Sequence, residues 1–243
     1  MTLIDFFRQV PKAALAFSGG VDSAYLLHIA RQLGCDIRPY FLRTPFQPDF
    51  ELKDAGKLAP DVTVVELDIL SLPEVAANPQ NRCYYCKKAM FTRLKEQAMS
   101  DGYSVLLDGT NASDRADDRP GMKVLTELNV LSPLRLCGLT KDDIRRRSRE
   151  VGLFTWDKAA YACLATRIPA GTAIDWDTLR RIESAEAALA SLGFTDFRVR
   201  VFHGAARIQL PKEQFPRSPE SYGQLTNALS PYFDHILLDL AGR

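Results

Sequence analysis

The chain has 243 residues and a formal net charge of +1, with 46% hydrophobic and 25% charged residues. This balance is typical of a globular protein with a sizeable core. The overall charge does not indicate a polyelectrolyte partner, although it leaves room for a local basic patch. No apolar run approaches the roughly 20 residues that span a bilayer, and the first residues, MTLIDFFRQVPK, do not resemble a secretion signal. We therefore expect no membrane segment, a cytoplasmic location and cysteines that form no disulfides.

Apolar patterning predicts strands that alternate with helices over the first part of the chain. In chain order these are a strand at 13–17, a helix at 23–33, a strand at 37–42, a helix at 50–58, a strand at 62–67, a helix at 86–99, a strand at 104–107 and a helix at 141–151. Such alternation predicts an α/β fold with a parallel sheet, in which ligands bind at the carboxyl ends of the strands. The turns SGGVDS and DGTN both follow predicted strands, so we expect them to meet at that edge.

The pattern changes after Arg167-Ile168-Pro169. A long helix is predicted at 175–192, followed by strands at 197–202 and 206–210, and by a last helix and a strand ending at 236–240. We therefore predict a domain at 1–170 and a smaller α+β C-terminal domain at 171–243.

The loop Ser18-Gly19-Gly20-Val21-Asp22-Ser23 joins a predicted strand to a predicted helix. Glycines let the backbone approach a ligand closely, and successive N–H groups at a helix N-terminus attract phosphate. Neither GxxxxGK[ST] nor GxGxxG is present, so two other phosphate loops are excluded. A capped Gly-Gly turn without a ligand is the alternative interpretation.

SGGVDS resembles the pyrophosphate loop of the PP-loop ATP pyrophosphatase superfamily, whose domain is Rossmann-like (adenine nucleotide alpha hydrolase-like). Members cleave ATP between its α and β phosphates and adenylate a substrate. The resemblance implies that Ser18, Gly19, Gly20 and Ser23 bind phosphate and that Asp22 serves Mg²⁺. It leaves the acceptor open among amidotransferases, NAD synthetases, tRNA thiolases and sulfur transferases.

The cysteines narrow this choice. Cys83 and Cys86 form a CxxC in NRCYYCKKAMF, and Cys163 lies in YACLATRIP. A zinc site needs four ligands, and neither a second CxxC nor an HxxxH is present; a redox pair or an unligated structural role are further alternatives. Three thiolates suit an iron–sulfur cluster with one open iron that can hold an exogenous sulfide. We interpret Cys35 as a small core residue. We also expect a structural role for Cys137, which lies just upstream of a helix that could border the site.

The wider sequence resembles the ATP-dependent sacrificial sulfur transferases that build the nickel-pincer nucleotide, the LarE family. The matching segments are SGGVDS, NPQNRCYYCKKAMF, DGTNASD, DRPGMK, SPLRLCGLTKDDIR, WDKAAYACLATRIPAG and FRVRVFHGAARIQLP. The resemblance implies adenylation of a pyridinium dicarboxylate mononucleotide, followed by thiocarboxylate formation and release of AMP. In one version of the family a single cysteine, at the place of Cys163, gives up its sulfur. In the other, three cysteines hold a [4Fe–4S] cluster, and this chain has all three, so we expect the cluster.

The same resemblance implies further site residues. Lys87 and the strand end Asp108-Gly109 are expected near the nucleotide, and Arg167 at the reaction centre, where a guanidinium can clamp phosphate or carboxylate. For Lys87, the alternative is a solvated side chain on the helix surface. For Arg167, the alternative is an ion pair that supports the loop.

On the substrate side, Arg198 and Arg200 alternate along a predicted strand, so both point to one face. The resemblance implies that they bind the substrate's phosphate, and solvated charges on an edge strand are the alternative. Glu186 matches a family acid near a metal or substrate, with a helix-surface role as the alternative. Gln209 departs from the family, since related proteins can have glutamate there.

Rival functions remain open. A tRNA thiolase shares the ATP loop, but the neutral chain has no long basic run and so disfavours a nucleic-acid partner. A second alternative is a synthetase that uses ammonia to form an amide, in which the cysteines have only a structural role. A third is a non-enzymatic sensor of adenine nucleotides, which binds ATP without releasing pyrophosphate. The expected partners are a small nucleotide substrate, an unidentified sulfur donor and, by resemblance, further copies of the chain.

Overall fold

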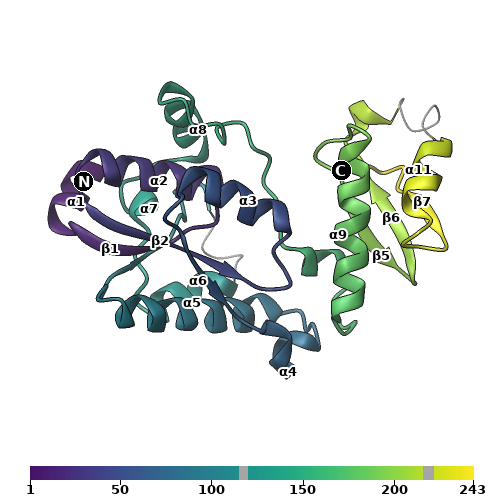
Figure 1. The fold of residues 1–243 in the computed structure, drawn as a ribbon, viewed down its shortest axis with the longest axis horizontal. Helices are drawn as coiled ribbons and strands as arrows, with labels where there is room; N and C mark the ends of the chain where they lie inside the picture. Colours follow the sequence, from purple (N-terminus) through teal and green to yellow (C-terminus); the bar gives the residue numbers. More distant parts are fainter. Residues whose placement is uncertain (115–119, 216–221) are drawn as a thin grey trace. The chain divides into compact units, whose positions relative to one another are not determined.

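The computed structural model describes residues 1–114, 120–215 and 222–243, which divide into two units (Figure 1). Unit 1 comprises Met1–Ile69 and Asn81–Ala160, and unit 2 comprises Leu70–Gln80 and Tyr161–Arg243. The expected boundary near residue 170 falls inside unit 2. The start of the DRPGMK segment, at Asp118 and Arg119, lies outside the described residues.

Segment 70–80 belongs to unit 2 because Asn78 ties it to the chain that follows Arg167. The Asn78 side-chain amide donates to the carbonyl oxygens of Pro169 (2.8 Å) and Thr172 (3.0 Å), and the backbone carbonyl of Asn78 accepts from Gly171 N (2.7 Å). A pairing of residues about ninety positions apart in the chain leaves no local trace in an apolar pattern. No helix in the described part of the chain is both long and apolar enough to cross a bilayer.

Unit 1 is built on a four-stranded sheet in the order β3-β2-β1-β4, with every pairing parallel. The strands are β1 (Lys12–Ala16), β2 (Asp36–Arg43), β3 (Thr63–Glu66) and β4 (Leu106–Leu107). The predicted α/β class with a parallel sheet is confirmed. In such a sheet the segments after β1 and β4, which are neighbours, emerge at the same edge.

Helices cover both faces of this sheet (Figure 1). They are α1 (Leu3–Gln9), α2 (Val21–Gln32), α3 (Asp49–Leu58), α5 (Arg82–Ser100), α6 (Pro120–Glu127), α7 (Pro133–Leu136) and α8 (Lys141–Glu150). Because side chains alternate along a strand, Leu15 packs into one core with α1, α2, α7 and α8, whereas its neighbour Ala14 packs into a second core with α5 and α6. Both faces are therefore buried, as expected for a parallel sheet.

Helix α5 begins at Arg82, one turn before the predicted start at residue 86. Its buried apolar positions, among them Phe91, Leu94 and Ala98, lie in the later turns, so periodicity alone did not reveal the first one. The earlier start places both cysteines of the CxxC on the helix.

Unit 2 is a smaller α+β unit, as predicted. Its elements include α4 (Pro73–Ala76), the 3₁₀ turn η2 (Leu164–Arg167), α9 (Trp176–Ser191), β5 (Arg198–Phe202), β6 (Ala205–Gln209), η3 (Lys212–Gln214), α11 (Tyr222–Leu229) and β7 (Ile236–Leu238), while η1 (Ile69–Ser71) spans the division. The sheet order is β5-β6-β7, antiparallel in the first pair and parallel in the second. The tight turn from β5 to β6 uses His203 and Gly204, both at positive φ (49° and 82°), as short hairpins require.

Candidate functional site

The glycine loop lies between β1 and α2, where the parallel sheet presents its ligand edge. Gly19 has φ +68°, and a Cβ there would lie 3.1 Å from backbone atoms of Ala55 in α3. Gly20 is the N-cap of α2 and carries no side-chain acceptor, so the first-turn N–H groups of the helix face the ligand edge. The Oγ atoms of Ser18 and Ser23 lie 3.2 Å apart across the loop. The loop is thus shaped by backbone, as a phosphate cradle requires.

Asp22 is held by groups from distant parts of unit 1. Its Oδ2 accepts a hydrogen bond from Lys141 Nζ at 2.6 Å, and its Oδ1 from Asn111 Nδ2 at 3.4 Å. Burial raises the pKa of the Asp22 carboxyl, and the ammonium of Lys141 opposes that rise. Lys141 was not singled out in the sequence; the available signal was its position directly after Thr140, the N-cap of a helix expected near the site.

The DGTN turn packs against the glycine loop, as its place after a neighbouring strand predicts. A Cβ on Gly109 would lie 3.1 Å from Ser23 N, so a larger residue there would press on the start of α2. Asp108 is buried (6% exposed); its carboxylate accepts hydrogen bonds from Ser132 Oγ (2.6 Å) and from the Thr110 hydroxyl. Burial raises the pKa of Asp108. Asp108 therefore supports the turn, with its carboxylate directed into the protein.

Lys87, on α5, lies beside the same edge. Its side chain runs along the start of α6, since a Cβ on Gly121 would lie 2.4 Å from Lys87 Cδ. Its positive charge lowers the pKa of Asp108, against the larger effect of burial. The structure thus brings Lys87 to the group formed by the glycine loop and Asp108-Gly109.

The two CxxC cysteines lie one turn apart on α5 in unit 1. Cys83 is exposed, and Arg82 Nη2 lies 3.7 Å from its Sγ; Cys86 is nearly buried, with its Sγ 3.5 Å from Met90 Sδ. An i, i+3 pair on a helix presents both thiols on one side. This arrangement suits two ligands of an iron–sulfur cluster, whose usual donors are thiolates.

Cys163 belongs to unit 2, where it is the N-cap of η2 and its carbonyl accepts from Thr166 Oγ1 at 2.8 Å. Within the described residues, no group of three or more His, Cys, Asp and Glu side chains is arranged around a common metal position.

Cys35 packs against the core of unit 1, as predicted, and Cys137 packs against the same core. Burial raises the pKa of both thiols.

Arg167 and Glu186 form a buried ion pair in unit 2, with side chains 0% and 6% exposed. Arg167 Nε donates to Glu186 Oε1 at 2.8 Å and Nη2 to Oε2 at 3.1 Å. Glu186 also accepts from Val199 N (2.9 Å) and from the Tyr161 hydroxyl. The helix-surface alternative for Glu186 is therefore wrong, because its carboxylate holds together η2, α9 and β5.

Arg198 and Arg200 differ in their surroundings, although both extend from the same face of β5. Arg198 is 5% exposed, lies over the Tyr161 ring and donates to Phe197 O at 2.6 Å. Arg200 donates to Gln209 Oε1 (2.6 Å) and to Thr166 O (2.5 Å). Burial lowers the pKa of both guanidinium groups, and the charge of Arg167 lowers it further.

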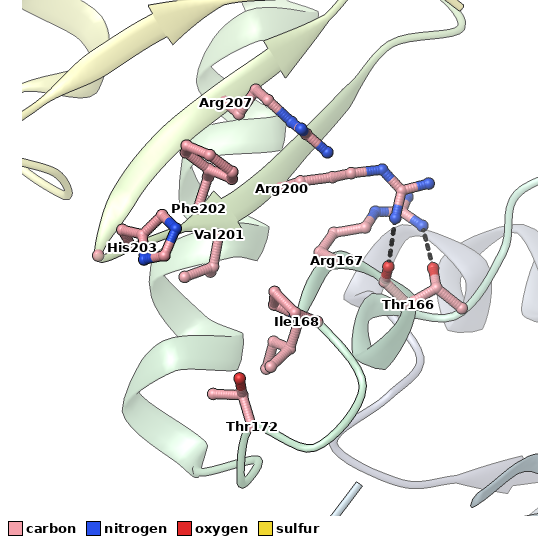
Figure 2. A pocket seen from close by; sticks show the side chains of 11 residues that line it. Thr166, Arg167, Ile168, Thr172, Arg200, Val201, Phe202, His203 and Arg207 are labelled. Carbon is pink, nitrogen blue, oxygen red and sulfur yellow. Dashed lines mark hydrogen bonds between the residues drawn. The ribbon is translucent and has the colours of Figure 1, made fainter. Parts of the chain in front are cut away.

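A pocket of about 480 Å³ opens in unit 2 beside Arg167 and Arg200 (Figure 2). Arg207, Phe202 and His203 line it as well, whereas Arg198 does not. Arg207 and Phe202 were not singled out as site residues in the sequence. Their signal was positional: they follow Arg200 on the same predicted hairpin.

The site residues thus form two groups, one in each unit. In unit 1 the structure brings together the glycine loop, Asp108-Gly109, Lys87 and the added Lys141, with Cys83 and Cys86 elsewhere on α5. In unit 2 it gathers Arg167, Glu186, Arg198 and Arg200 around η2, with Cys163 at the start of that turn.

No family model matches the chain. An uncharacterized protein of Synechocystis is 35% identical over 248 aligned positions, which cover 99% of this chain and 92% of that protein. The pyridinium-3,5-bisthiocarboxylic acid mononucleotide synthase of Lactiplantibacillus plantarum is 32% identical, with 99% and 90% covered. An uncharacterized protein of Methanocaldococcus jannaschii is 30% identical over 199 positions, with 82% and 77% covered.

Proposed function

This chain belongs to the LarE family, and from that premise we propose that it is an ATP-dependent sulfur transferase acting on a pyridinium dicarboxylate mononucleotide. The relative from L. plantarum is named as a synthase of a bisthiocarboxylic acid mononucleotide. Such a product requires the replacement of a carboxylate oxygen by sulfur. We infer the same conversion here.

The reaction that we propose has two steps. A substrate carboxylate attacks the α-phosphate of ATP, which forms an acyl adenylate and releases pyrophosphate. Sulfur then attacks the acyl carbon, and the acyl–oxygen bond to AMP breaks, so the products are a thiocarboxylate and AMP. A carboxylate oxygen is a poor leaving group, whereas AMP leaves readily from the acyl adenylate. The first step therefore explains the need for ATP.

The observation that carries ATP use is the backbone-lined loop at the N-terminus of α2. Ser18, Gly19, Gly20 and Ser23 would hold the pyrophosphate end of ATP through N–H and hydroxyl groups. Asp22 would supply an oxygen ligand to Mg²⁺, since carboxylates are suited to that ion. Lys87, Asp108 and Gly109 would complete the nucleotide side, Lys87 as a cation near the phosphates and Asp108-Gly109 as the turn that shapes the edge.

The substrate side would be in unit 2, where positive charge accumulates. Arg198 and Arg200 would attract the phosphate of the mononucleotide, and Arg167 would lie at the reaction centre. Glu186 would act as a positioning residue, because it binds Arg167 through two hydrogen bonds. The loss of Glu186 would therefore disturb the arginine that it orients.

For the sulfur carrier we propose a [4Fe–4S] cluster held by Cys83, Cys86 and Cys163. When bound, such a cluster would leave one iron open to carry the sulfide that is transferred. The chain's contribution is three thiolates, two of them one turn apart on α5. The alternative is that Cys163 gives up its own sulfur.

The proposal is tested with anaerobically purified protein, ATP, Mg²⁺ and the nucleotide dicarboxylate. We expect pyrophosphate, AMP and a thiocarboxylate in matching amounts. Incorporation of nitrogen in place of sulfur would contradict the proposal, as would ATP binding without pyrophosphate release. Mass spectrometry of the protein after turnover separates the two sulfur sources: an intact chain indicates the cluster, whereas loss of sulfur and two hydrogens at Cys163 indicates sacrifice.

A further inference from the structure

Asn78 is a buried asparagine between α4 and α5, and it has no part in the function proposed above. The residue is 2% exposed, and its backbone has φ 53°, a left-handed conformation that asparagine adopts more readily than most residues. Its side-chain nitrogen donates to the carbonyl oxygens of Pro169 at 2.8 Å and Thr172 at 3.0 Å. The amide therefore binds the chain that follows Arg167.

Backbone hydrogen bonds strengthen this attachment. Gly171 N donates to the backbone carbonyl of Asn78, and Ile174 N donates to Ala76 O, both at 2.7 Å. A buried N–H or C=O group that loses its partner is costly, so the side chain of Asn78 and the carbonyl oxygens around it hold one another in place. Within unit 2, segment 70–80 is thus fixed to the chain at 168–174.

The attachment lies close to the points where the chain passes from one unit to the other. The chain returns from unit 2 to unit 1 between residues 80 and 81, just before Cys83. It passes into unit 2 again between residues 160 and 161, just before Cys163. Both cysteine segments therefore begin where the chain changes units, and Asn78 precedes the first of these points by three positions.

Sulfur transfer as proposed above needs thiols from both units at one place, and domains of one chain can move relative to one another. Cys83 and Cys163 are eighty positions apart in the chain. By contrast, Asn78 is five positions before Cys83, and Pro169 is six positions after Cys163. Segments of five and six residues reach at most about 18 and 22 Å. The hydrogen bond between Asn78 and Pro169 therefore provides a short connection between the two cysteine segments.

We propose that Asn78 is a positioning residue for the sulfur-transfer step. By binding the carbonyl oxygens of Pro169 and Thr172, it keeps the start of the CxxC helix near the segment that carries Cys163. It acts through the cysteines, so its loss should disturb the delivery of sulfur more than the adenylation. The inference rests on the proposed function for the role of the cysteines, whereas the attachment itself is a contact within unit 2.

Cross-linking of the full chain without iron tests the positioning. Each protein is treated anaerobically with a short bis-maleimide, and peptide mass spectrometry measures the product that joins Cys83 or Cys86 to Cys163. We expect this product in the unchanged protein, and a yield at least about fivefold lower in Asn78→Asp, because a carboxylate cannot donate to the two carbonyl oxygens. Absence of the product in the unchanged protein would overturn the proposal, as would equal yields in the two proteins.

Two further variants assign the effect to the hydrogen bonds. Asn129→Asp is the matched control, because Asn129 also has a left-handed backbone, with φ 54°, but is exposed in unit 1. Its cross-link yield should equal that of the unchanged protein. Asn78→Gly is compatible with the same backbone conformation and adds no charge, so it should lower the yield as Asn78→Asp does. A loss confined to Asn78→Asp would show an effect of the new charge and overturn the proposal.

The ratio of thiocarboxylate to AMP in the first turnover gives a second measurement. Only molecules that complete adenylation contribute to this ratio, so a smaller folded fraction does not change it. We expect equal amounts in the unchanged protein and in Asn129→Asp. In Asn78→Asp the ratio should fall about fivefold or more, because a misplaced sulfur reacts slowly and water attacks the acyl adenylate instead.

The two measurements separate this inference from the proposed function. If thiocarboxylate forms and neither the ratio nor the cross-link yield changes in Asn78→Asp, the positioning role fails and the function stands. If none of the proteins forms thiocarboxylate but the cross-link yield depends on Asn78, the proposed function fails and the positioning of the cysteines stands.

Discussion

The ammonium of Lys141 lies 2.6 Å from the carboxylate of Asp22. This contact links the first position of α8 to the first turn of α2, and the two side chains are 31% and 21% exposed. The pair sits at the edge where the parallel sheet presents ligands. The carboxylate that we propose as a Mg²⁺ ligand is therefore ion-paired with a lysine from a distant helix.

Replacement of Lys141 by methionine should shift the pH dependence of ATP-driven pyrophosphate release. Burial raises the pKa of Asp22, and Lys141 is the largest opposing influence. Without the ammonium this pKa rises further, so less Asp22 is ionised at a given acidic pH, and the acid limb of the profile moves to higher pH. We also expect kcat/KM for ATP to fall about tenfold or more, since a hydrogen bond to a charged group is worth about 1.5–3 kcal/mol.

Lys12→Met is the control for that experiment. Lys12 is also ion-paired, with its Nζ 3.6 Å from Asp36, but it lies at the opposite end of β1 from the glycine loop. Its removal should leave the pH profile in place. An acid limb that does not move in Lys141→Met would show that the pair has no part in nucleotide chemistry.

Gly19→Ala should weaken both the fold and the binding of ATP. An alanine at φ +68° costs about 1–2 kcal/mol, and its Cβ would press on the backbone of α3 at 3.1 Å. Urea denaturation should show a free energy of unfolding lower by at least that amount. Gly56→Ala, in α3 with open space around it, should instead gain about 0.5–1 kcal/mol. Equal stability of the two variants would rule out the close approach at Gly19.

Glu186→Gln should destabilise the protein strongly. The substitution leaves Arg167 buried without its counter-charge, which typically costs about 3–5 kcal/mol, and the Arg167 side chain has no exposed area. Denaturant unfolding followed by circular dichroism measures the loss. Asp177→Asn, at an exposed position in the first turn of the same helix, should cost less than about 1 kcal/mol. A loss in Glu186→Gln no larger than in the control would contradict the positioning role.

Anaerobic reconstitution with iron and sulfide tests the three cysteines. We expect visible absorbance of a [4Fe–4S] cluster that is lost in the Cys83→Ala, Cys86→Ala and Cys163→Ala variants, because thiolates are the ligands. Cys35→Ala removes a thiol that packs against the core of unit 1 and should retain the absorbance. Full absorbance in any of the first three variants would contradict ligation by that cysteine.

The parallel α/β class, the glycine loop and the family could all be predicted from the amino-acid sequence. These features depend on short-range patterns: the apolar run before Ser18, two adjacent glycines, and segments whose residues match a family one by one. The types of the strands and helices followed from periodicity within about a dozen residues. The packing of Cys35 against the core followed from its place at the end of a helix. Local chemistry suffices where a residue's neighbours in the chain are also its neighbours in space.

The contacts between side chains that are distant in the chain could not be predicted in this way, because they depend on how the elements pack. Lys141 and Asp22 are 119 positions apart, and their contact depends on how α8 packs beside α2. The burial of Glu186 depends on η2 and β5 closing over α9, and the opposition of Arg200 and Arg207 depends on strand register. Each of these three contacts depends on how separate helices and strands pack or pair. The periodicity of residues within one helix or strand carries no information about such contacts.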